Sequence, residues 1–145
     1  MTNQLLKNLE NYQLKGSFVF KQDSILSEVC TIPKTNELAG LYLFYDGDTN
    51  ELLYVGISGR TNKEGKIVFK KDGLRGRFLK GKQFGDFRRN SLPKQMVLES
   101  INSLKIKWYG TYHSECFDHP RVLEISILKA FLVKNNRLPR WNKEI

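Results

Sequence analysis

The feature that most constrains the fold of this chain is a pair of apolar segments separated by a short polar turn. Residues 38–45 and 52–57 are rich in aliphatic and aromatic side chains, and the sequence Asp-Gly-Asp-Thr-Asn at 46–50 lies between them. Two such segments joined by turn-forming residues are typical of a β-hairpin. The sequence therefore predicts two antiparallel strands that lie side by side in the core.

The remaining secondary structure follows from hydrophobic spacing, glycines and prolines. The elements expected are helices at 2–11, 74–79, 93–103 and 120–135, a short extended piece at 17–20, and a strand at 106–112. In the helix that starts at Pro93, we expect Met96, Val97 and Ile101 to face inward. The predicted fold class is α/β (α+β), with a small three-stranded sheet, formed by the hairpin and a third strand, and helices flanking it.

Length and composition indicate one domain, because 145 residues with 40% hydrophobic content can bury one core but not two. We expect residues 1–37 to form an N-terminal extension, a helix plus a loop, that packs on a main domain at 38–145. Residues 59–73 are expected to be a basic loop inserted in that domain. Cys30 and Cys116 suggest neither a disulfide framework nor a zinc site, and we expect both to be buried, reduced packing residues.

Membrane association and secretion are not expected. No stretch approaches the roughly 20 apolar residues that a membrane span needs. The first residues, Met1-Thr2-Asn3-Gln4, lack the charged and apolar regions of a signal peptide. The expected location is therefore inside the cell, in the cytoplasm.

The positive charge of the chain is concentrated in one segment. Residues 60–94 contain twelve Lys or Arg and three acids, and the rest of the chain contains twelve of each, so this segment carries the whole net charge of +9. Such an excess favours binding to the phosphates of a nucleic acid, and a solvated lysine-rich loop is the alternative. The residues expected to contact nucleic acid are Arg60, Lys70, Lys71, Arg75, Lys80, Lys82, Arg88 and Arg89.

Two short blocks in the predicted hairpin each contain a tyrosine and a glycine. They are Gly40-Leu41-Tyr42 on the first strand and Tyr54-Val55-Gly56 on the second. In this order, and on adjacent strands, they resemble the two blocks that name the GIY-YIG nucleases, with Leu41 and Val55 in place of the isoleucines. Ordinary strand aromatics are the alternative explanation for both tyrosines.

Three further positions match the same family in order and approximate spacing. Arg77 resembles the catalytic arginine, which a leucine, here Leu74, precedes by three residues. Glu124 resembles the helix-borne metal-binding glutamate, and Asn142 resembles the asparagine near the end of the domain. The resemblance covers residues 38–142 and implies a GIY-YIG-like catalytic domain at 38–145, whose catalytic residues would be Tyr42, Tyr54, Arg77, Glu124 and Asn142.

Glu124 can also be singled out without reference to a family. On a helix with about 100° between residues, it shares a face with Ile127, Leu128 and Phe131. A carboxylate in an apolar stripe needs a cation, a strong donor or a proton, because an unpaired buried charge is very costly. Metal ligation is one interpretation, and a first-turn glutamate stabilised by the helix dipole is the other.

The resemblance implies an endonuclease that hydrolyses phosphodiester bonds in DNA with Mg²⁺, or with Mn²⁺ in its place. Glu124 would hold the metal, and Arg77 would bind the scissile phosphate. One tyrosine, with Tyr42 favoured, would orient or deprotonate the attacking water, while Tyr54 would hydrogen-bond a phosphate oxygen or a metal-bound water. Asn142 would orient Glu124 or the backbone around it. Restriction, repair and mobile-element roles all fit this core.

Two features depart from the family pattern. Many members have a histidine one helical turn after the arginine, but Gly81 occupies that position here, and Lys80 or Lys82 could supply a cation instead. The segment before Leu74 is also longer than in minimal modules of the family. For His113 and His119, which precede the last helix, capping or surface roles are favoured over catalysis.

The expected partner is DNA, and the sequence leaves RNA and a homodimer open. Cutting both strands with one site per chain would require a dimer or two successive nicks. Two alternatives compete with the enzyme. One is a non-catalytic nucleic-acid-binding module that retains the nuclease fold, and the other is a protein-interaction domain whose charge is incidental.

Overall fold

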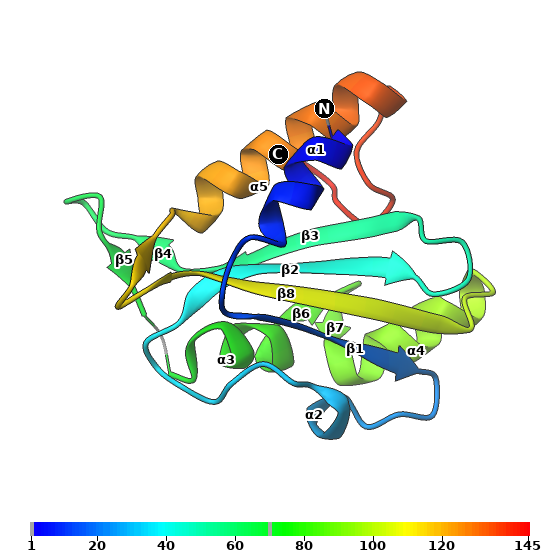
Figure 1. Ribbon diagram of the computed structural model, residues 1–145. Helices are drawn as coiled ribbons and strands as arrows, with labels where there is room; N and C mark the ends of the chain where they lie inside the picture. Colours follow the sequence, from blue (N-terminus) through cyan, green and yellow to red (C-terminus); the bar gives the residue numbers. More distant parts are fainter. Residues whose placement is uncertain (1, 70) are drawn as a thin grey trace.

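A computed structural model describes residues 2–69 and 71–145, and its central antiparallel sheet separates two layers of helices (Figure 1). The sheet has five strands, in the order β1 (Lys15–Lys21), β8 (Ser103–His113), β2 (Ala39–Asp46) and β3 (Leu52–Ser58), with β9 (Cys116–Phe117) paired to β8. One face carries α1 (Thr2–Leu9) and α5 (Pro120–Asn135). The other face carries α2 (Leu26–Val29), α3 (Gly73–Lys80) and α4 (Arg88–Leu98). Two small hairpins lie outside the sheet and consist of β4 (Arg60–Thr61) with β5 (Ile67–Val68), and β6 (Lys82–Gln83) with β7 (Asp86–Phe87).

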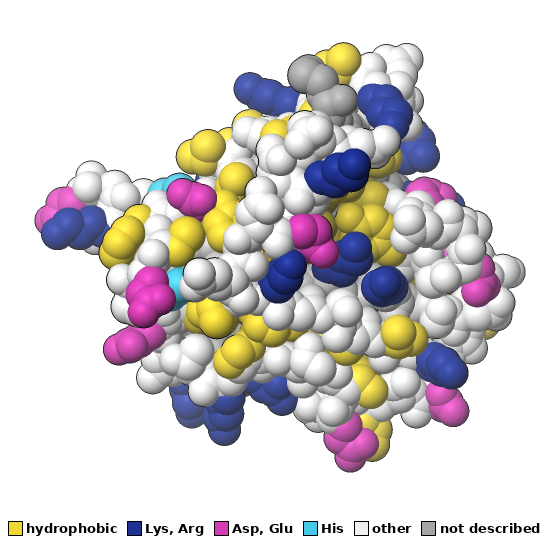
Figure 2. Space-filling model, in the orientation of Figure 1, with side chains coloured by type: hydrophobic (Ala, Val, Ile, Leu, Met, Phe, Trp, Pro, Cys, Tyr) yellow, Lys and Arg dark blue, Asp and Glu magenta, His cyan; other side chains and the backbone are white. Residues whose placement is uncertain are grey.

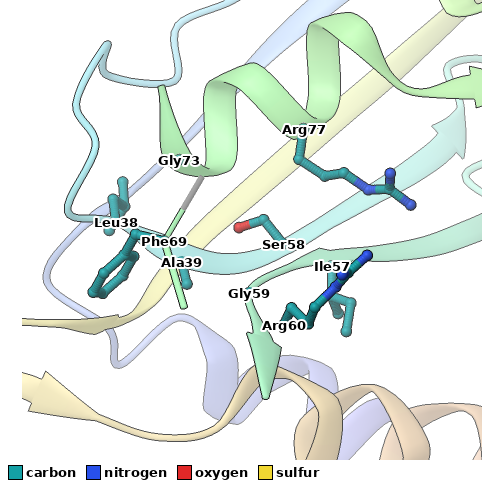
Figure 3. A pocket seen from close by; sticks show the side chains of 9 residues that line it. All are labelled: Leu38, Ala39, Ile57, Ser58, Gly59, Arg60, Phe69, Gly73 and Arg77. Carbon is teal, nitrogen blue, oxygen red and sulfur yellow. The ribbon is translucent and has the colours of Figure 1, made fainter. Parts of the chain in front are cut away.

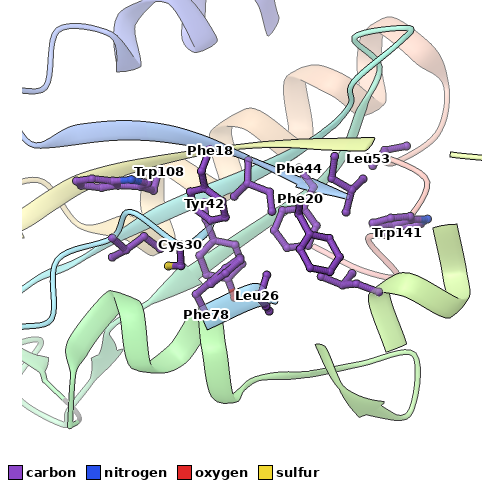
Figure 4. Close-up of a cluster of buried hydrophobic side chains, with 14 of the residues drawn as sticks. Phe18, Phe20, Leu26, Cys30, Tyr42, Phe44, Leu53, Phe78, Trp108 and Trp141 are labelled. Atoms are coloured by element: carbon purple, nitrogen blue, oxygen red, sulfur yellow. The ribbon is translucent and has the colours of Figure 1, made fainter. Parts of the chain in front are cut away.

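Strand β2 lies at the centre because its side chains are apolar on both faces. Leu41 and Leu43 point toward α1 and α5, whereas Tyr42 and Phe44 point toward α3 and α4. Every residue from 39 to 45 is buried. Two separate hydrophobic clusters result, one on each face of the sheet. Figure 4 shows the cluster between the sheet and the helices α3 and α4, where Tyr42 packs edge-on against Phe78.

The predicted mixed α and β fold is confirmed, and the hairpin is confirmed by the antiparallel pairing of β2 with β3. The predicted size of the sheet is wrong, because β1 and β9 extend the expected three strands to five. Strand β1 comes from the segment 1–37, where the sequence predicts only a short extended piece at 17–20. Its partner is β8, so that Phe18 lies opposite Ile106. A pairing between such distant residues leaves no local sequence pattern.

Helix α4 differs from its prediction at both ends. It begins at Arg88 and carries Pro93 inside, where the missing N–H leaves the Arg89 carbonyl without its usual partner. It ends at Leu98. Ser100 then adopts a left-handed conformation (φ 57°), and the Ile101 N–H bonds back to the carbonyl of residue 96 at 2.8 Å. Of the three residues predicted to face inward, Met96 and Ile101 are buried, but Val97 is 61% exposed.

Two further expectations concern cysteines and membranes. Both cysteines are free, and Cys30 is buried as predicted, whereas Cys116 is only half-buried on the short strand β9. Within residues 2–69 and 71–145, no helix is long and apolar enough to cross a membrane.

Candidate active site

Three of the predicted catalytic side chains line one cleft at the β3 edge of the sheet. This hollow of about 440 Å³, the β3 cleft, is lined by Tyr54, Lys82, Gln83, Phe84, Gly85, Arg121, Glu124, Trp141, Asn142, Lys143, Glu144 and Ile145. Tyr54 comes from β3, Glu124 from α5, and Asn142 from the segment after α5. The sheet thus brings together residues from three distant parts of the chain, with three cations, Lys82, Arg121 and Lys143, beside them.

Glu124 is 9% exposed and lies on the buried face of α5 with Ile127 and Leu128, as the helical spacing predicts. Its partner is Arg121, whose Nη1 donates to Oε1 at 2.5 Å. A carboxylate in an apolar stripe needs a compensating charge or donor, and Arg121 provides one. None of the hydrogen bonds among the described residues engages the other oxygen, Oε2, so the carboxylate can accept a second cation.

His119 positions the start of the same helix. It is the N-cap of α5, where its Nδ1 accepts a hydrogen bond from the backbone N–H of Arg121 at 3.3 Å. Its Nε2 lies 2.8 Å from the hydroxyl oxygen of Thr61 on β4. The capping role favoured from the sequence is confirmed, and it fixes the turn of helix that presents Arg121 and Glu124.

Asn142 binds the exposed edge of β3. Its Oδ1 accepts from the Val55 N–H at 2.9 Å, and its Nδ2 donates to the Val55 carbonyl at 3.0 Å. The neighbouring Trp141 N–H donates to the Leu53 carbonyl at 2.8 Å. The amide therefore orients the backbone beside Tyr54, and not Glu124 or the backbone around it as the resemblance implies.

The two tyrosines of the hairpin differ in accessibility. Tyr42 is 1% exposed, its ring covers Gly56, and its hydroxyl accepts a hydrogen bond from Nη2 of Arg88 at 3.0 Å. Tyr54 is only partly buried and lines the β3 cleft, with its ring centroid 6.3 Å from that of Tyr42. The preference for Tyr42 as the group that contacts water is therefore corrected in favour of Tyr54.

Opposing effects act on the Tyr54 phenol. Burial raises the pKa of Tyr54 above its ordinary value, and Tyr42 adds to this increase, while the charges of Arg88 and Arg77 act in the opposite direction. The net pKa is raised, so Tyr54 is a neutral phenol near pH 7. To serve as a base, it would need a further positive charge in the β3 cleft.

Arg77 lines a second, smaller pocket further along β3. This hollow of about 220 Å³ is lined by Leu38, Ala39, Ile57, Ser58, Gly59, Arg60, Phe69, Gly73 and Arg77. Figure 3 shows the guanidinium groups of Arg77 and Arg60 on one side of it and the ring of Phe69 on the other. Ser58 and Tyr54 are four residues apart on one strand, or about 13 Å. The two hollows are therefore neighbours, and the charge of Arg77 still acts on Tyr54.

The cations predicted to contact nucleic acid fall into three groups. Arg60, Lys71, Lys80, Lys82 and Arg89 are exposed, and Lys and Arg side chains gather below α3 on the face seen in Figure 2. Two predictions are wrong, because Arg75 donates to the carbonyls of Ser27, Cys30 and Ile32, and Arg88 is 1% exposed. Both guanidinium groups are used inside the protein. Lys70 lies outside the described residues.

The carboxylates suit one kind of metal site only. Within the described part of the chain, no three His, Cys, Asp or Glu side chains gather to hold a metal ion. Glu124 and Glu144 are the two acidic residues that line the β3 cleft. Mg²⁺ is commonly held by one or two carboxylates together with water and substrate phosphates. The residues therefore fit a magnesium ion that binds together with a phosphate, and they do not form a site of protein ligands alone.

Comparisons of the chain with protein-family models, curated proteins and solved structures find no match. The resemblance to GIY-YIG nucleases therefore rests on the sequence blocks alone.

Proposed function

We propose that this chain is a Mg²⁺-dependent endonuclease that hydrolyses phosphodiester bonds in DNA at the β3 edge of its sheet. The observation that carries the proposal is the convergence of Tyr54, Glu124 and Asn142 on one cleft. Each occupies a position that the resemblance to the GIY-YIG pattern assigns to a catalytic residue. Unrelated side chains would not be expected to share one cleft that three cations, Lys82, Arg121 and Lys143, also line.

Each residue has a chemical role in this proposal. Mg²⁺, held by Glu124, would polarise the phosphoryl group and activate a water molecule. Arg77 would bind the scissile phosphate with its forked guanidinium and stabilise the charge that develops on it. Tyr54 would hydrogen-bond the attacking water or a phosphate oxygen. Asn142 would hold β3, and with it Tyr54, in place.

The test is cleavage of supercoiled plasmid by wild type and by Glu124→Gln and Arg77→Ala. We expect nicking with Mg²⁺ or Mn²⁺ and none with EDTA, and each variant should lose at least about 100-fold in rate. The matched controls are Glu115→Gln and Lys129→Ala, which replace exposed residues outside both hollows. Equal cleavage by all five proteins, or cleavage that persists in EDTA, would exclude the proposed site.

One contact favours a second candidate, a nucleic-acid-binding module without cleavage. Arg121 forms an ion pair with Glu124, and such a pair can stabilise the first turns of α5 in a protein that does not cleave DNA. In that case, no variant would cut DNA or RNA under any condition. Glu124→Gln and wild type would then bind DNA equally, with an affinity that falls as salt rises.

A further inference from the structure

Arg88 is a charged side chain buried in an aromatic environment. It is 1% exposed, and its Cζ lies 5.0 Å from the ring centroid of Tyr42 and 5.9 Å from that of Tyr54. The rings of Phe44 and Phe78 lie at 5.9 and 5.8 Å. None of the salt bridges among the described residues involves Arg88. A buried charge without an opposite charge is costly, so this arginine requires an explanation.

All its hydrogen-bond partners are neutral. Nη1 donates to the carbonyls of Arg77 at 3.2 Å and Phe78 at 2.9 Å, and Nε donates to Oε1 of Gln83 at 3.0 Å. Nη2 donates to the Tyr42 hydroxyl at 3.0 Å. The two carbonyls belong to the last turn of α3, the negative end of its dipole, which stabilises the guanidinium without cancelling its charge. The positive charge therefore remains available to the tyrosines.

The space for this guanidinium is left by Gly81. A Cβ at that position would lie 2.3 Å from Nη1 of Arg88 and 2.7 Å from the Arg77 carbonyl. The sequence suggests Lys80 or Lys82 as the cation one turn after Arg77. The Lys80 side chain is 66% exposed, and Lys82 is exposed with its Nζ 5.2 Å from the centroid of the Phe87 ring. Arg88 is the cation that occupies the space beside Gly81.

We infer that Arg88 is a positioning residue of the proposed site, whose buried guanidinium fixes the Tyr42 hydroxyl and supplies a permanent positive charge to the Tyr42–Tyr54 pair. This inference rests on the proposed function for its role in cleavage. The placement of the Arg88 charge beside the two tyrosines rests on the observed contacts alone. Arg88 also holds the backbone of Arg77, so one side chain links the two predicted catalytic elements, the hairpin and α3.

The charge of Arg88 affects the ionisation of Tyr54. A positive charge next to a phenol favours its ionised form, and the charge of Arg88 acts to lower the pKa of Tyr54 against the larger effect of burial. If Arg88 only filled space, its replacement by a neutral side chain of similar length would leave the ionisation of Tyr54 unchanged.

The test is a pH titration of ¹³Cζ-labelled tyrosines by NMR, without DNA or metal, in wild type, Arg88→Met and Arg88→Lys. Tyr42→Phe and Tyr54→Phe assign the signals. In Arg88→Met, we expect Tyr54 to ionise only at a proton concentration at least tenfold lower than in wild type. Arg88→Lys should largely restore the proton concentration at which Tyr54 ionises in wild type. The control is Arg89→Met, which removes the adjacent exposed arginine. An unchanged titration in folded Arg88→Met would overturn the inference.

A wild-type measurement decides the case if Arg88→Met does not fold. The guanidinium ¹⁵N and ¹H signals of Arg88 should be protected from exchange and should shift at the pH at which Tyr54 ionises. Arg88 signals that exchange freely with solvent, or that do not shift when the tyrosine ionises, would show that the guanidinium is not held beside the phenols. In active protein, Arg88→Met should also move the pH profile of cleavage upward. Absence of cleavage in wild type would refute the proposed function and leave the titration result intact.

Discussion

At the scale of single residues, Gly56 shows why a tyrosine and a glycine accompany each other on the hairpin. Gly56 lies opposite Tyr42 in the β2–β3 pair, and a Cβ at position 56 would lie 2.2 Å from Cε2 of the Tyr42 ring. Tyr42 is fully buried among aromatic rings and cannot move aside. The Tyr-Val-Gly block therefore has a packing reason of its own, independent of catalysis.

Gly56→Ala should consequently destabilise the protein by about 3 kcal/mol, the upper range for an overpacked core. Gly85→Ala is the comparison, because nothing lies within 4 Å of a Cβ there. Its φ of 82° should cost only about 1 to 2 kcal/mol. Urea unfolding of the three proteins measures both effects. A smaller loss for Gly56→Ala than for Gly85→Ala would show that the Tyr42 ring has room to move.

The same scale marks a limit of sequence analysis. Tyr54, Glu124 and Asn142 could be selected because their residue types and order match a family pattern. Arg88 could not be assigned correctly, because it belongs to the basic segment 60–94, whose cations are expected to contact phosphates, and arginine is seldom fully buried. Only the position of α3 over β2 shows where that side chain goes. Gly81 marks the free space, but the sequence does not say what fills it.

At the scale of elements, the segment after α5 is fastened to the rest of the molecule at two places. The first is the end of α4, where Glu99 accepts hydrogen bonds from Gln95 at 2.5 Å, Arg140 at 2.6 Å and Trp141 Nε1 at 2.8 Å. Burial acts to raise the pKa of Glu99, but the three donors together outweigh it, and the pKa lies below its ordinary value.

The sign of the pH dependence follows from this lowered pKa. Glu99 contributes stability above the unfolded-state pKa, about 4.3, and loses that contribution as the pH falls through the lower folded-state pKa. Glu99→Gln should cost about 1 to 2 kcal/mol at pH 7. The difference from wild type should shrink between about pH 4 and pH 3. Urea unfolding at several pH values measures it, and a difference that does not vary with pH would contradict the assignment.

The second fastening is the amide of Asn142 on Val55. Asn142→Asp keeps the shape but loses the donor to the Val55 carbonyl. We expect faster hydrogen exchange at the Val55 amide, by roughly tenfold for a loss of about 1.4 kcal/mol. Asn11→Asp, at an exposed position, should leave that exchange rate unchanged. Equal exchange rates in Asn142→Asp and wild type would mean that the tail is held without this amide.

At the scale of the whole molecule, residues 15–21 complete the sheet. Strand β1 pairs with β8 along its full length. Phe18 and Phe20 are buried in the cluster between the sheet and the helices α3 and α4. The sequence could not predict this role, because it indicates only a short extended piece at 17–20 and the partner strand lies far away in the chain. The local hairpin, by contrast, could be predicted from its turn.

Removing residues 2–21 should therefore expose the hydrogen-bonding edge of β8 and produce aggregates. Removing residues 2–9, which form α1, leaves β1 in place and should lower stability without causing aggregation. Among the described side chains of α1, only Leu9 is buried. Size-exclusion chromatography with light scattering distinguishes the two outcomes. A soluble monomer after removal of residues 2–21 would show that β1 is dispensable.

Binding of DNA also belongs to this scale. Of the cations predicted to contact nucleic acid, Arg75 and Arg88 are used internally, whereas Arg60, Lys71, Lys80, Lys82 and Arg89 are exposed. If all five bind phosphates, the slope of log K against log salt should be about −4 to −5. Lys82→Ala should reduce its magnitude by about 1, whereas Arg75→Met should leave it unchanged. Fluorescence anisotropy over a range of salt concentrations measures these slopes.

The β3 cleft takes Glu124 from the layer of α5 and Lys82 from the opposite layer, and each layer packs on its own hydrophobic cluster. A chain that has formed only one cluster, for example while it is still being synthesised, therefore lacks part of the cleft. With the proposed activity, such a chain would be harmless to the DNA and RNA around it. Completion of folding would itself switch the enzyme on.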